Sequence, residues 1–383
     1  MASRTSFDPA QAQHELAHAD ATPARTAAGA PAHAAGASPA LAQIQAVRSS
    51  GWAAVEEIAA IARTARSEWP GIATWLQDHR GNGFVQEVLA ELAGTPSKTA
   101  KLPIVLLHGF NTGPGDGMSF ADAVKDGMRG DGALVFEVTA PPFQTPAERA
   151  KAIAPQLEQI LRKTGASKLN LIAHSLGGLD ARFLISSLGW ADRIASLSTL
   201  GTPHHGTPTA DLVAGAMPAA AKPALDSVGR WVGKHVNQNP MAENADVLGT
   251  VGSMTSGEAK RFNAANPDRP GVYYQSWAGL STFDGGLDDA ELAQVGPIHD
   301  RPADPRRADR LHPALYLGAL TSGGLNDGAV PVDSARWGNY RGAVMGDHFD
   351  LIGQDEEGAN PRTGFDPAAF YRQMARDLGR RGF

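Results

Sequence analysis

The residues that could carry out chemistry gather first around Ser175, in the stretch Leu171-Ile172-Ala173-His174-Ser175-Leu176-Gly177. An apolar run ends just before the serine, and a helix-like segment follows over 178–188. A strand, a tight turn and a helix in this order are typical of a nucleophile elbow, which presents a serine hydroxyl at the tip of a strained turn. Residues two before and two after the serine must be small for that turn to close, and Ala173 and Gly177 meet this requirement.

A serine hydroxyl is a weak nucleophile at its ordinary pKa, so it needs a base within hydrogen-bonding distance and a third group that orients the base. His348 is the best candidate base, because it follows a strand-like run over 342–345 and is the last histidine of the chain. Asp327 is the best candidate acid, because it lies in a tight Asn-Asp-Gly turn that could present its carboxylate. Other carboxylates compete for the role of the acid: Asp284, Asp333 and Asp347.

The oxyanion that develops during attack on a carbonyl needs two backbone N–H donors. We expect one from Leu176, the residue after the serine, and the other from Phe110, which follows His108-Gly109. His108 and His174 are expected to orient loops rather than to move protons. His204 and His205, in the loop 201–206, are expected to be structural loop histidines near the site.

A parallel sheet covered by helices would bring these residues together. Short strand-like runs alternate along the chain with helix-like segments, and the first of them, 103–107, is wholly apolar, as expected of a strand buried on both faces. The runs expected to be strands are 103–107, 133–138, 169–172, 194–200 and 271–277. The segments expected to be helices include 119–129, 147–163 and 367–378. This alternation predicts an α/β fold with a mostly parallel, doubly wound sheet, in which ligands bind at the carboxyl ends of the strands.

The remaining segments define the expected domain organisation. Residues 1–40 are rich in Ala, Pro, Gly, Ser and Thr and are expected to form a disordered tail. Residues 41–97 show helical periodicity and are expected to be an N-terminal helical extension, whose apolar faces would pack on the main domain. It could instead be a module for secretion, membrane contact or partner binding. The catalytic domain would occupy 98–383, with an insertion at about 207–265 that is either a lid or a structural excursion.

Composition excludes several classes of protein. The formal net charge of −6 over 383 residues gives no basic footprint for nucleic acid. The absence of cysteine excludes disulfides, a cysteine nucleophile and thiolate metal sites. No apolar run is long enough for a transmembrane helix, and no ordinary signal peptide is visible.

These motifs, in this order, resemble those of bacterial true lipases of the α/β-hydrolase superfamily, the secreted lipases of Pseudomonas and Burkholderia type. The matching pieces are 105–110, 171–178, 181–182, 200–206, 262–263, 271–274, 326–330 and 348–350. The resemblance implies an α/β-hydrolase fold in which Ser175 is the nucleophile, Asp327 the acid and His348 the base. It also implies an ester or lipid substrate and transient contact with a lipid interface.

The same resemblance implies a structural calcium ion that braces the loop carrying the histidine. The family has a carboxylate two residues after the histidine and a glutamine four further on, and Asp350 and Gln354 stand at these positions. A further family aspartate precedes an apolar segment before the acid turn, and Asp309 matches it best. Oxygen ligands suit calcium; the alternative is that these are ordinary surface carboxylates. No cofactor is expected for the chemistry itself.

The sequence also departs from that family, because many members have two cysteines, a signal peptide and no long N-terminal extension. The export route and the location in the cell are therefore left open. The expected function is lipase-like hydrolysis of carboxylic esters by a Ser-His-Asp triad. A phospholipase effector, a polyester depolymerase or an acyltransferase would use the same residues. The alternative of another class is a non-catalytic binding module on a hydrolase fold.

Overall fold

The protein is described by a computed structural model over residues 38–49, 55–92, 99–110, 119–217, 220, 222–231, 239, 241–295, 298, 306–354 and 359–383. The chain forms two compact units, residues 1–97 and 98–383, and each is described here by itself. The expected disordered tail lies outside the described residues up to residue 37, as does the glycine-rich segment 113–117. Pro39 and Ala40, at the end of that expected tail, are helical.

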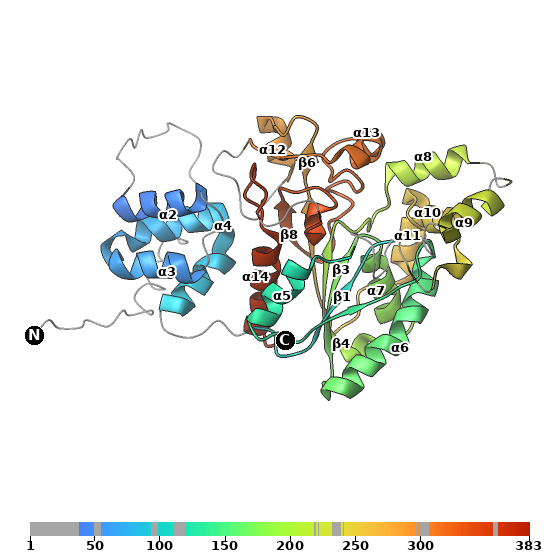
Figure 1. Cartoon of the computed structure of the whole chain (residues 1–383), viewed down its shortest axis with the longest axis horizontal. Coiled ribbons are helices and arrows are strands. Elements are labelled where there is room, and N and C mark those ends of the chain that lie inside the picture. The colour runs from blue at the N-terminus through green and yellow to red at the C-terminus, as the bar shows by residue number, and fades with distance from the viewer. Residues whose placement is uncertain are drawn as a thin grey trace, which may run out of the picture. The chain divides into compact units, whose positions relative to one another are not determined.

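The N-terminal unit contains α2 (Pro39–Ser49), α3 (Val55–Thr64), a short 3₁₀ turn (Arg66–Glu68) and α4 (Trp69–Leu92) (Figure 1). Their apolar side chains form one buried cluster, which includes Ile44, Ile58, Ile72, Leu76 and Val88. The helices thus bury their apolar faces against one another, where we had expected the main domain as the partner. None of the described helices is long and apolar enough to cross a membrane.

The larger unit is built on a six-stranded sheet in the order β2-β1-β3-β4-β5-β8, and every neighbouring pair is parallel. The strands are β1 (Ile104–Leu107), β2 (Val135–Val138), β3 (Leu169–His174), β4 (Ile194–Leu200), β5 (Tyr273–Gly279) and β8 (Asn339–Val344). The parallel sheet expected from the alternating pattern is confirmed, and it is an α/β-hydrolase fold. β1, β3 and β4 are buried along their whole lengths, because both faces of the sheet are covered.

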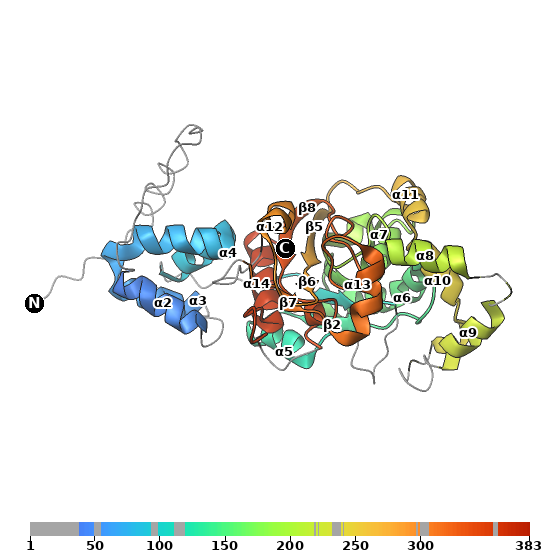
Figure 2. The same cartoon turned by 90° about the horizontal axis from the view of Figure 1, so that it is seen from above.

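Helices cover both faces of the sheet, and the alternation of side chains along β1 shows which helix covers which face (Figures 1 and 2). Ile104 and Leu106 pack in one cluster with residues of α5 (Asp122–Gly130) and α14 (Pro367–Arg380). Val105 and Leu107 pack in another with residues of α6 (Pro146–Thr164) and α7 (Gly177–Ser186). Successive side chains of a strand point to opposite faces, so β1 is fixed from both sides.

The insertion between β4 and β5 is helical, as expected. It contains α8 (Pro208–Ala216), α9 (Lys222–Trp231), a 3₁₀ turn (Ala242–Asn244), α10 (Val247–Ser253) and α11 (Ser256–Ala265). Beyond β5 the chain forms a second small sheet of β6 (Ser281–Thr282) and β7 (Asp309–Arg310), together with α12 (Asp289–Val295), α13 (Tyr316–Ser322) and short 3₁₀ turns at Ala191–Arg193, Pro313–Leu315 and Asp350–Ile352. The apolar run that precedes Asp327 is therefore a helix, α13.

Candidate active site

Ser175 lies at the turn between β3 and α7 with a left-handed backbone (φ 54°). An L-residue adopts this conformation only where its surroundings enforce it, and the flanking chain does so. The Ser175 N–H donates to the Leu200 carbonyl at 2.9 Å, and the Thr202 hydroxyl donates to the Ser175 carbonyl at 2.8 Å. The local backbone is that of the expected elbow.

The elbow needs a small residue at Gly177 for a reason that differs from the expected one. A Cβ placed on Gly177 would lie 2.7 Å from the carbonyl oxygens of both Leu107 and His108. The nearest atoms to such a Cβ therefore belong to the end of β1, whereas the sequence had suggested Ala173, across the turn, as the close neighbour. Gly178 is equally constrained, because a Cβ there would overlap the Thr202 side chain at 2.2 Å. The start of α7 thus packs directly against the ends of two strands.

The structure brings Ser175, His348 and Asp327 into one hydrogen-bonded row. The His348 Nε2 and the Ser175 Oγ are 2.9 Å apart, and the His348 Nδ1 is 2.8 Å from Asp327 Oδ2. His348 also donates its backbone N–H to the Asp327 carbonyl at 2.9 Å. The histidine is thus fixed both by its ring and by its main chain, with one ring nitrogen toward the serine and the other toward the carboxylate.

Asp327 is fully buried, and hydrogen bonds reach both of its carboxylate oxygens. Oδ1 accepts from the backbone N–H groups of Ala329 and Val330 at 3.0 and 2.7 Å, and Oδ2 faces His348. The turn that achieves this is the predicted Asn-Asp-Gly turn: Gly328 has φ 92°, and its N–H donates to the Asn326 side chain. Burial would lower the pKa of His348, but the charge and hydrogen bond of Asp327, together with the charge of Asp347, raise it above its ordinary value.

The other histidines are held in structural contacts. His108 accepts the Ala140 N–H on Nε2 at 3.1 Å and lies 2.9 Å from the Gly109 carbonyl through Nδ1, and burial lowers its pKa to about 3. His174 packs its ring 4.4 Å from that of His348, and burial followed by the charge of His348 lowers its pKa well below the usual value. His204 is buried beside the Thr199 hydroxyl at 3.0 Å, and His205 reaches the Arg336 carbonyl.

The two expected oxyanion donors lie at the ends of β1 and β3. Phe110 follows β1, and Leu176 immediately precedes α7, where helix N-termini leave N–H groups without intrahelical partners. Among the described residues, neither backbone N–H donates to another protein atom. A Cβ on Gly109 would lie 3.2 Å from Ser175 Cβ, so the Phe110 loop runs close to the serine.

The competing acids lie elsewhere. Asp284 accepts the Gly286 N–H at the protein surface, and the Asp333 side chain is 92% exposed beside Arg336. Asp347 is buried, but it accepts the N–H groups of His312 and Phe349. Of the candidate carboxylates, only Asp327 bonds the ring of His348.

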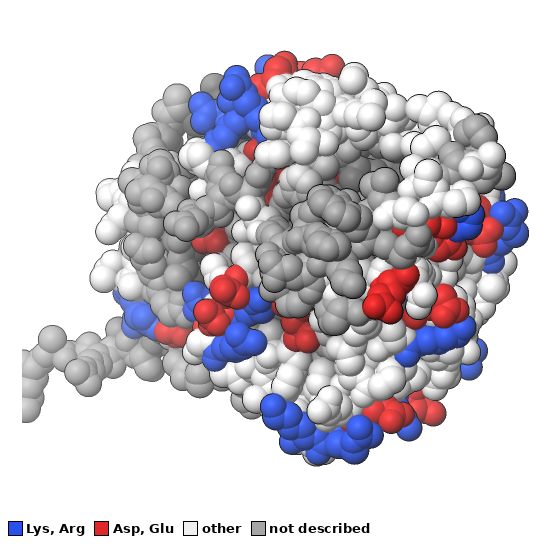
Figure 3. All heavy atoms as spheres, turned by 45° about the vertical axis from the view of Figure 1, so that its right-hand side comes forward, with Lys and Arg blue, Asp and Glu red and all other residues white. Residues whose placement is uncertain are grey.

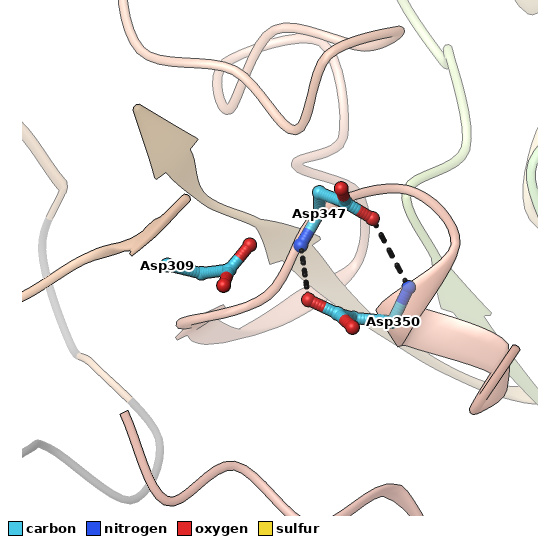
Figure 4. Close-up of side chains that lie close together, drawn as sticks. All are labelled: Asp309, Asp347 and Asp350. Carbon is cyan, nitrogen blue, oxygen red and sulfur yellow. Dashed lines mark hydrogen bonds between the residues drawn. The ribbon is translucent and has the colours of Figure 1, made fainter. Parts of the chain in front are cut away.

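A second buried group of carboxylates lies next to this row. Asp309, Asp347 and Asp350 each offer one oxygen, and these oxygens lie within 4.8 Å of one another (Figure 4). Asp350 Oδ2 accepts the Asp347 N–H at 3.0 Å, and Asp309 Oδ1 accepts from Asn360, but Asp309 Oδ2 has no hydrogen-bond partner among the described atoms. Burial first, and then the charges of neighbouring carboxylates, raises the pKa of both Asp309 and Asp350.

Two of the three expected calcium ligands belong to this cluster. Asp309 and Asp350 meet as expected. Asp347 joins them, although its sequence position had suggested only a competing acid. Gln354 points its amide nitrogen at the Ser119 carbonyl. The Asp347 contribution could have been inferred from its separation of three residues from Asp350, which one 3₁₀ turn (Asp350–Ile352) and its preceding loop bring to the same side.

Comparison with known proteins gives the same overall picture. No protein-family model matches the chain. It is 27% identical over 306 residues to a triacylglycerol lipase of Vibrio cholerae, and the alignment covers 74% of this chain and 89% of that lipase. It is 25% identical over 311 residues to a triacylglycerol lipase of Pseudomonas fragi, and the alignment covers 75% of this chain and 99% of that lipase. Among solved structures, the Staphylococcus hyicus lipase has the same fold, with a TM-score of 0.52 and 17% identity over 74% of this chain and 97% of that one.

The two relatives are matched over nearly their whole lengths, and the solved lipase shares the parallel sheet described above. The chain is thus similar over about three quarters of its length to bacterial triacylglycerol lipases, and it has the α/β-hydrolase fold.

Proposed function

We propose that the protein hydrolyses carboxylic esters through an acyl-enzyme on Ser175, with His348 as the base and Asp327 as the group that orients it. The observation that carries this proposal is the position of His348, whose two ring nitrogens bridge Ser175 Oγ and Asp327 Oδ2 at 2.9 and 2.8 Å. A serine, a histidine and a buried carboxylate joined in this way can activate the serine hydroxyl.

In the first half of the reaction, Ser175 Oγ attacks the ester carbonyl carbon while His348 Nε2 accepts its proton. The tetrahedral intermediate then collapses: the bond to the alcohol oxygen breaks, and His348 returns the proton to that oxygen. In the second half, water gives a proton to His348 and attacks the acyl group. The carboxylic acid leaves, and His348 returns the proton to Ser175. Asp327 keeps the proton of the neutral imidazole on Nδ1 and stabilises the imidazolium.

The N–H groups of Phe110 and Leu176 would bind the oxygen that becomes negative in both intermediates. Donors fixed before the reaction are most effective here, because they need no reorganisation when the charge develops. Leu176 also stands at the N-terminus of α7, where the helix dipole favours negative charge.

The substrate is proposed to be a triacylglycerol or a related lipid ester, as the names of the relatives suggest. An uncharged surface over α8 and α13 supports contact with a lipid interface (Figure 3). Leu317, Leu320 and Leu212 are 73, 69 and 57% exposed there. The two helices are joined by hydrogen bonds of Thr209 to the Thr321 hydroxyl and the Gly318 carbonyl. Apolar side chains held in such a patch favour an apolar partner.

We also propose that the cluster of Asp309, Asp347 and Asp350 holds a calcium ion. The cluster fits a hard cation with oxygen ligands, because three buried carboxylates converge and Asp309 Oδ2 has no described partner. When bound, calcium would neutralise these charges and brace the loop that carries His348. None of the chemical steps above passes through the ion.

The test of the ester hydrolase is p-nitrophenyl ester hydrolysis over a series of acyl-chain lengths, for the wild type and for Ser175→Ala. Activity on long chains that disappears in the variant is expected. If Ser175→Ala keeps the activity of the wild type, the assignment of the nucleophile is wrong. A wild type that acts only on short chains is a general esterase. A wild type that acts on none directs the assay to phospholipids, polyesters and alcohol acceptors.

The interfacial patch is tested separately with Leu317→Ser/Leu320→Ser. Its activity on emulsified triacylglycerol is expected to fall, while its activity on a soluble short-chain ester stays at the wild-type level. An equal loss on both substrates would show a defect in the site itself and would refute the interfacial role.

A further inference from the structure

The segment 140–143, between β2 and α6, touches both the oxyanion loop and the helical insertion. It has no role in the reaction described above. Its last residue, Phe143, has a left-handed backbone with φ 51°. Among the described non-glycine residues, only Ser175 shares this conformation. An L-residue is held there only when surrounding contacts enforce it, so the contacts of this segment are informative.

On one side, the segment is bonded to the loop that carries Phe110. The Phe143 N–H donates to the Phe110 carbonyl at 3.0 Å, and the two rings meet edge to face with centroids 5.8 Å apart. The Ala140 N–H donates to His108 Nε2 at 3.1 Å. This segment therefore holds the carbonyl and the ring of Phe110, the residue whose N–H is the proposed oxyanion donor.

Arg149 of α6 ties the same two segments together from the core. Its side chain is fully buried, and Nη1 donates to the Pro141 carbonyl at 2.9 Å. Nη2 donates to the carbonyls of His108 and Gly109 at 3.0 and 2.8 Å, while Nε pairs with Asp180 of α7 at 2.7 Å. Segment 140–143 is therefore anchored to the rigid part of the domain as well as to the loop.

On the other side, the segment is bonded to the insertion. The Asp246 N–H donates to the Phe143 carbonyl at 2.6 Å, and the Asn239 side chain donates to the Ala140 carbonyl at 3.0 Å. Gly229 of α9 lies against the Phe143 ring, since a Cβ there would be 3.4 Å from Phe143 Cδ2. The two faces of one short segment therefore bond elements that are far apart in sequence.

We propose that Phe143 is a positioning residue that couples the helical insertion to the oxyanion loop. The coupling runs from Asp246 and Gly229 through the backbone and ring of Phe143 to the carbonyl and ring of Phe110. The insertion would then influence the geometry of the oxyanion donor, so that a change in the insertion alters kcat and not only substrate binding. This inference rests on the proposed role of Phe110 as an oxyanion donor.

The insertion offers a remote place at which the coupling can be perturbed. Asp246 Oδ1 accepts from Lys222 Nζ at 2.5 Å and from the Gly249 N–H at 2.9 Å, so Lys222 helps to hold Asp246 in place. The Lys222 side chain is 44% exposed, so Lys222→Met should leave the fold intact. The matched control is Arg261→Met, which removes an exposed ion pair with Glu258 inside the same insertion.

The first experiment measures amide deuterium uptake in the segment 140–143 of the full chain, for the wild type, Lys222→Met, Phe143→Gly and Arg261→Met, because the N–H groups of residues 140 and 143 donate to His108 and Phe110. Glycine adopts φ 51° freely, so Phe143→Gly removes the ring without adding backbone strain. Faster uptake at these two amides is expected in Lys222→Met and Phe143→Gly, and wild-type uptake in Arg261→Met. Unchanged uptake in both test variants overturns the coupling. Deuterium uptake can be measured whether or not the protein hydrolyses esters. The coupling and the proposed ester hydrolase activity can therefore be refuted independently of each other.

The second experiment is a double-mutant cycle on ester hydrolysis. Removing a whole oxyanion donor costs about 10²–10³-fold in kcat, so displacing one should cost less, about 10-fold for Phe143→Gly and about 3-fold for Lys222→Met, with KM changing less than kcat. In the Phe143→Gly background, Lys222→Met should cost less than in the wild type, because the ring contact with Phe110 is lost and glycine no longer holds the two backbone bonds in one conformation. Additive losses, or losses confined to KM, would overturn the proposal.

Discussion

Asp327 and the cluster of Asp309, Asp347 and Asp350 are both buried, but they differ in how completely protein atoms hydrogen-bond their carboxylate oxygens. Asp327 has hydrogen bonds to both oxygens, from Ala329, Val330 and His348. In the acidic cluster, Asp309 Oδ2 lacks a described partner, and no described lysine or arginine forms a salt bridge with Asp309 or Asp350.

The comparison shows that burial alone does not define a catalytic carboxylate. A buried charge is tolerated when donors or an opposite charge compensate it. Asp327 meets this condition with protein atoms alone, because both of its carboxylate oxygens are hydrogen-bonded in the folded protein. Burial and the charges of neighbouring carboxylates raise the pKa of two members of the cluster. The proposed calcium ion would compensate these charges, and the three predictions below test whether the cluster and the row through Asp327 act separately.

The largest effect is expected from Asp327→Asn. An asparagine amide would donate to His348 Nδ1 and so place the ring proton on Nε2, where it cannot accept the serine proton. In serine hydrolases the equivalent change lowers kcat by about 10⁴-fold, and we expect a loss of this order in p-nitrophenyl ester hydrolysis. The calcium-dependent rise in thermal stability should remain.

The matched control for this variant is Asp333→Asn, a change of the same kind at an exposed side chain paired with Arg336. Surface pairs of this type contribute little, so kcat should stay at the wild-type value. If Asp327→Asn behaved like this control, the row through His348 would not be the catalytic group.

The sequence allowed most of the row to be predicted, because each member stands in a local pattern that its chemistry requires. The elbow around Ser175 and the Asn-Asp-Gly turn at Asp327 are short-range features. The cluster was harder, because Asp309 comes from β7 and its two partners from the loop after β8. Only the fold brings Asp309 to the other two, so the cluster as a whole could not be recognised from the sequence, although Asp347 lies three residues before Asp350.

The fold shows the same contrast between features that local sequence patterns predict and features that join distant segments of the chain. The strands were predicted closely, because a short run that is apolar on both faces permits few other structures. The helix α4 runs unbroken to Leu92 through Gly81 and Gly83, although glycine disfavours the interior of a helix. The bonds of segment 140–143 to residues 110, 239 and 246 join distant parts of the chain, and no spacing in the sequence signals them.

An intermediate effect, on the calcium-dependent stability of the fold, is expected from Asp309→Asn. In the wild type, calcium at about 100 times its Kd should add about 2.7 kcal/mol to the free energy of unfolding, because only the folded state presents the site. Asp309→Asn removes one ligand and one charge, so this increase should largely disappear, while the calcium-free protein should be at least as stable as the wild type. Thermal unfolding with calcium and with a chelator measures both quantities. An undiminished calcium response in the variant would place the ion elsewhere.

The smallest effects on activity and calcium binding are expected from substitutions of Gly201 and Gly346. Gly201 lies against the row through Asp327 and Gly346 lies against the acidic cluster, so the two variants test whether the row and the cluster act separately. A Cβ on Gly201 would lie 2.7 Å from Asp327 Oδ2 and 3.2 Å from His348 Nδ1, whereas one on Gly346 would lie 2.8 Å from the Asp350 Cβ. Because a misplacement of about 1 Å can cost about 10²-fold in rate, and the shift needed here is smaller, Gly201→Ala should lower kcat about 10-fold and keep the calcium response. Gly346→Ala should weaken the calcium response and leave kcat unchanged at saturating calcium. If Gly346→Ala lowered kcat under those conditions as much as Gly201→Ala does, the loop would transmit strain between the groups, and the two could no longer be treated as separate.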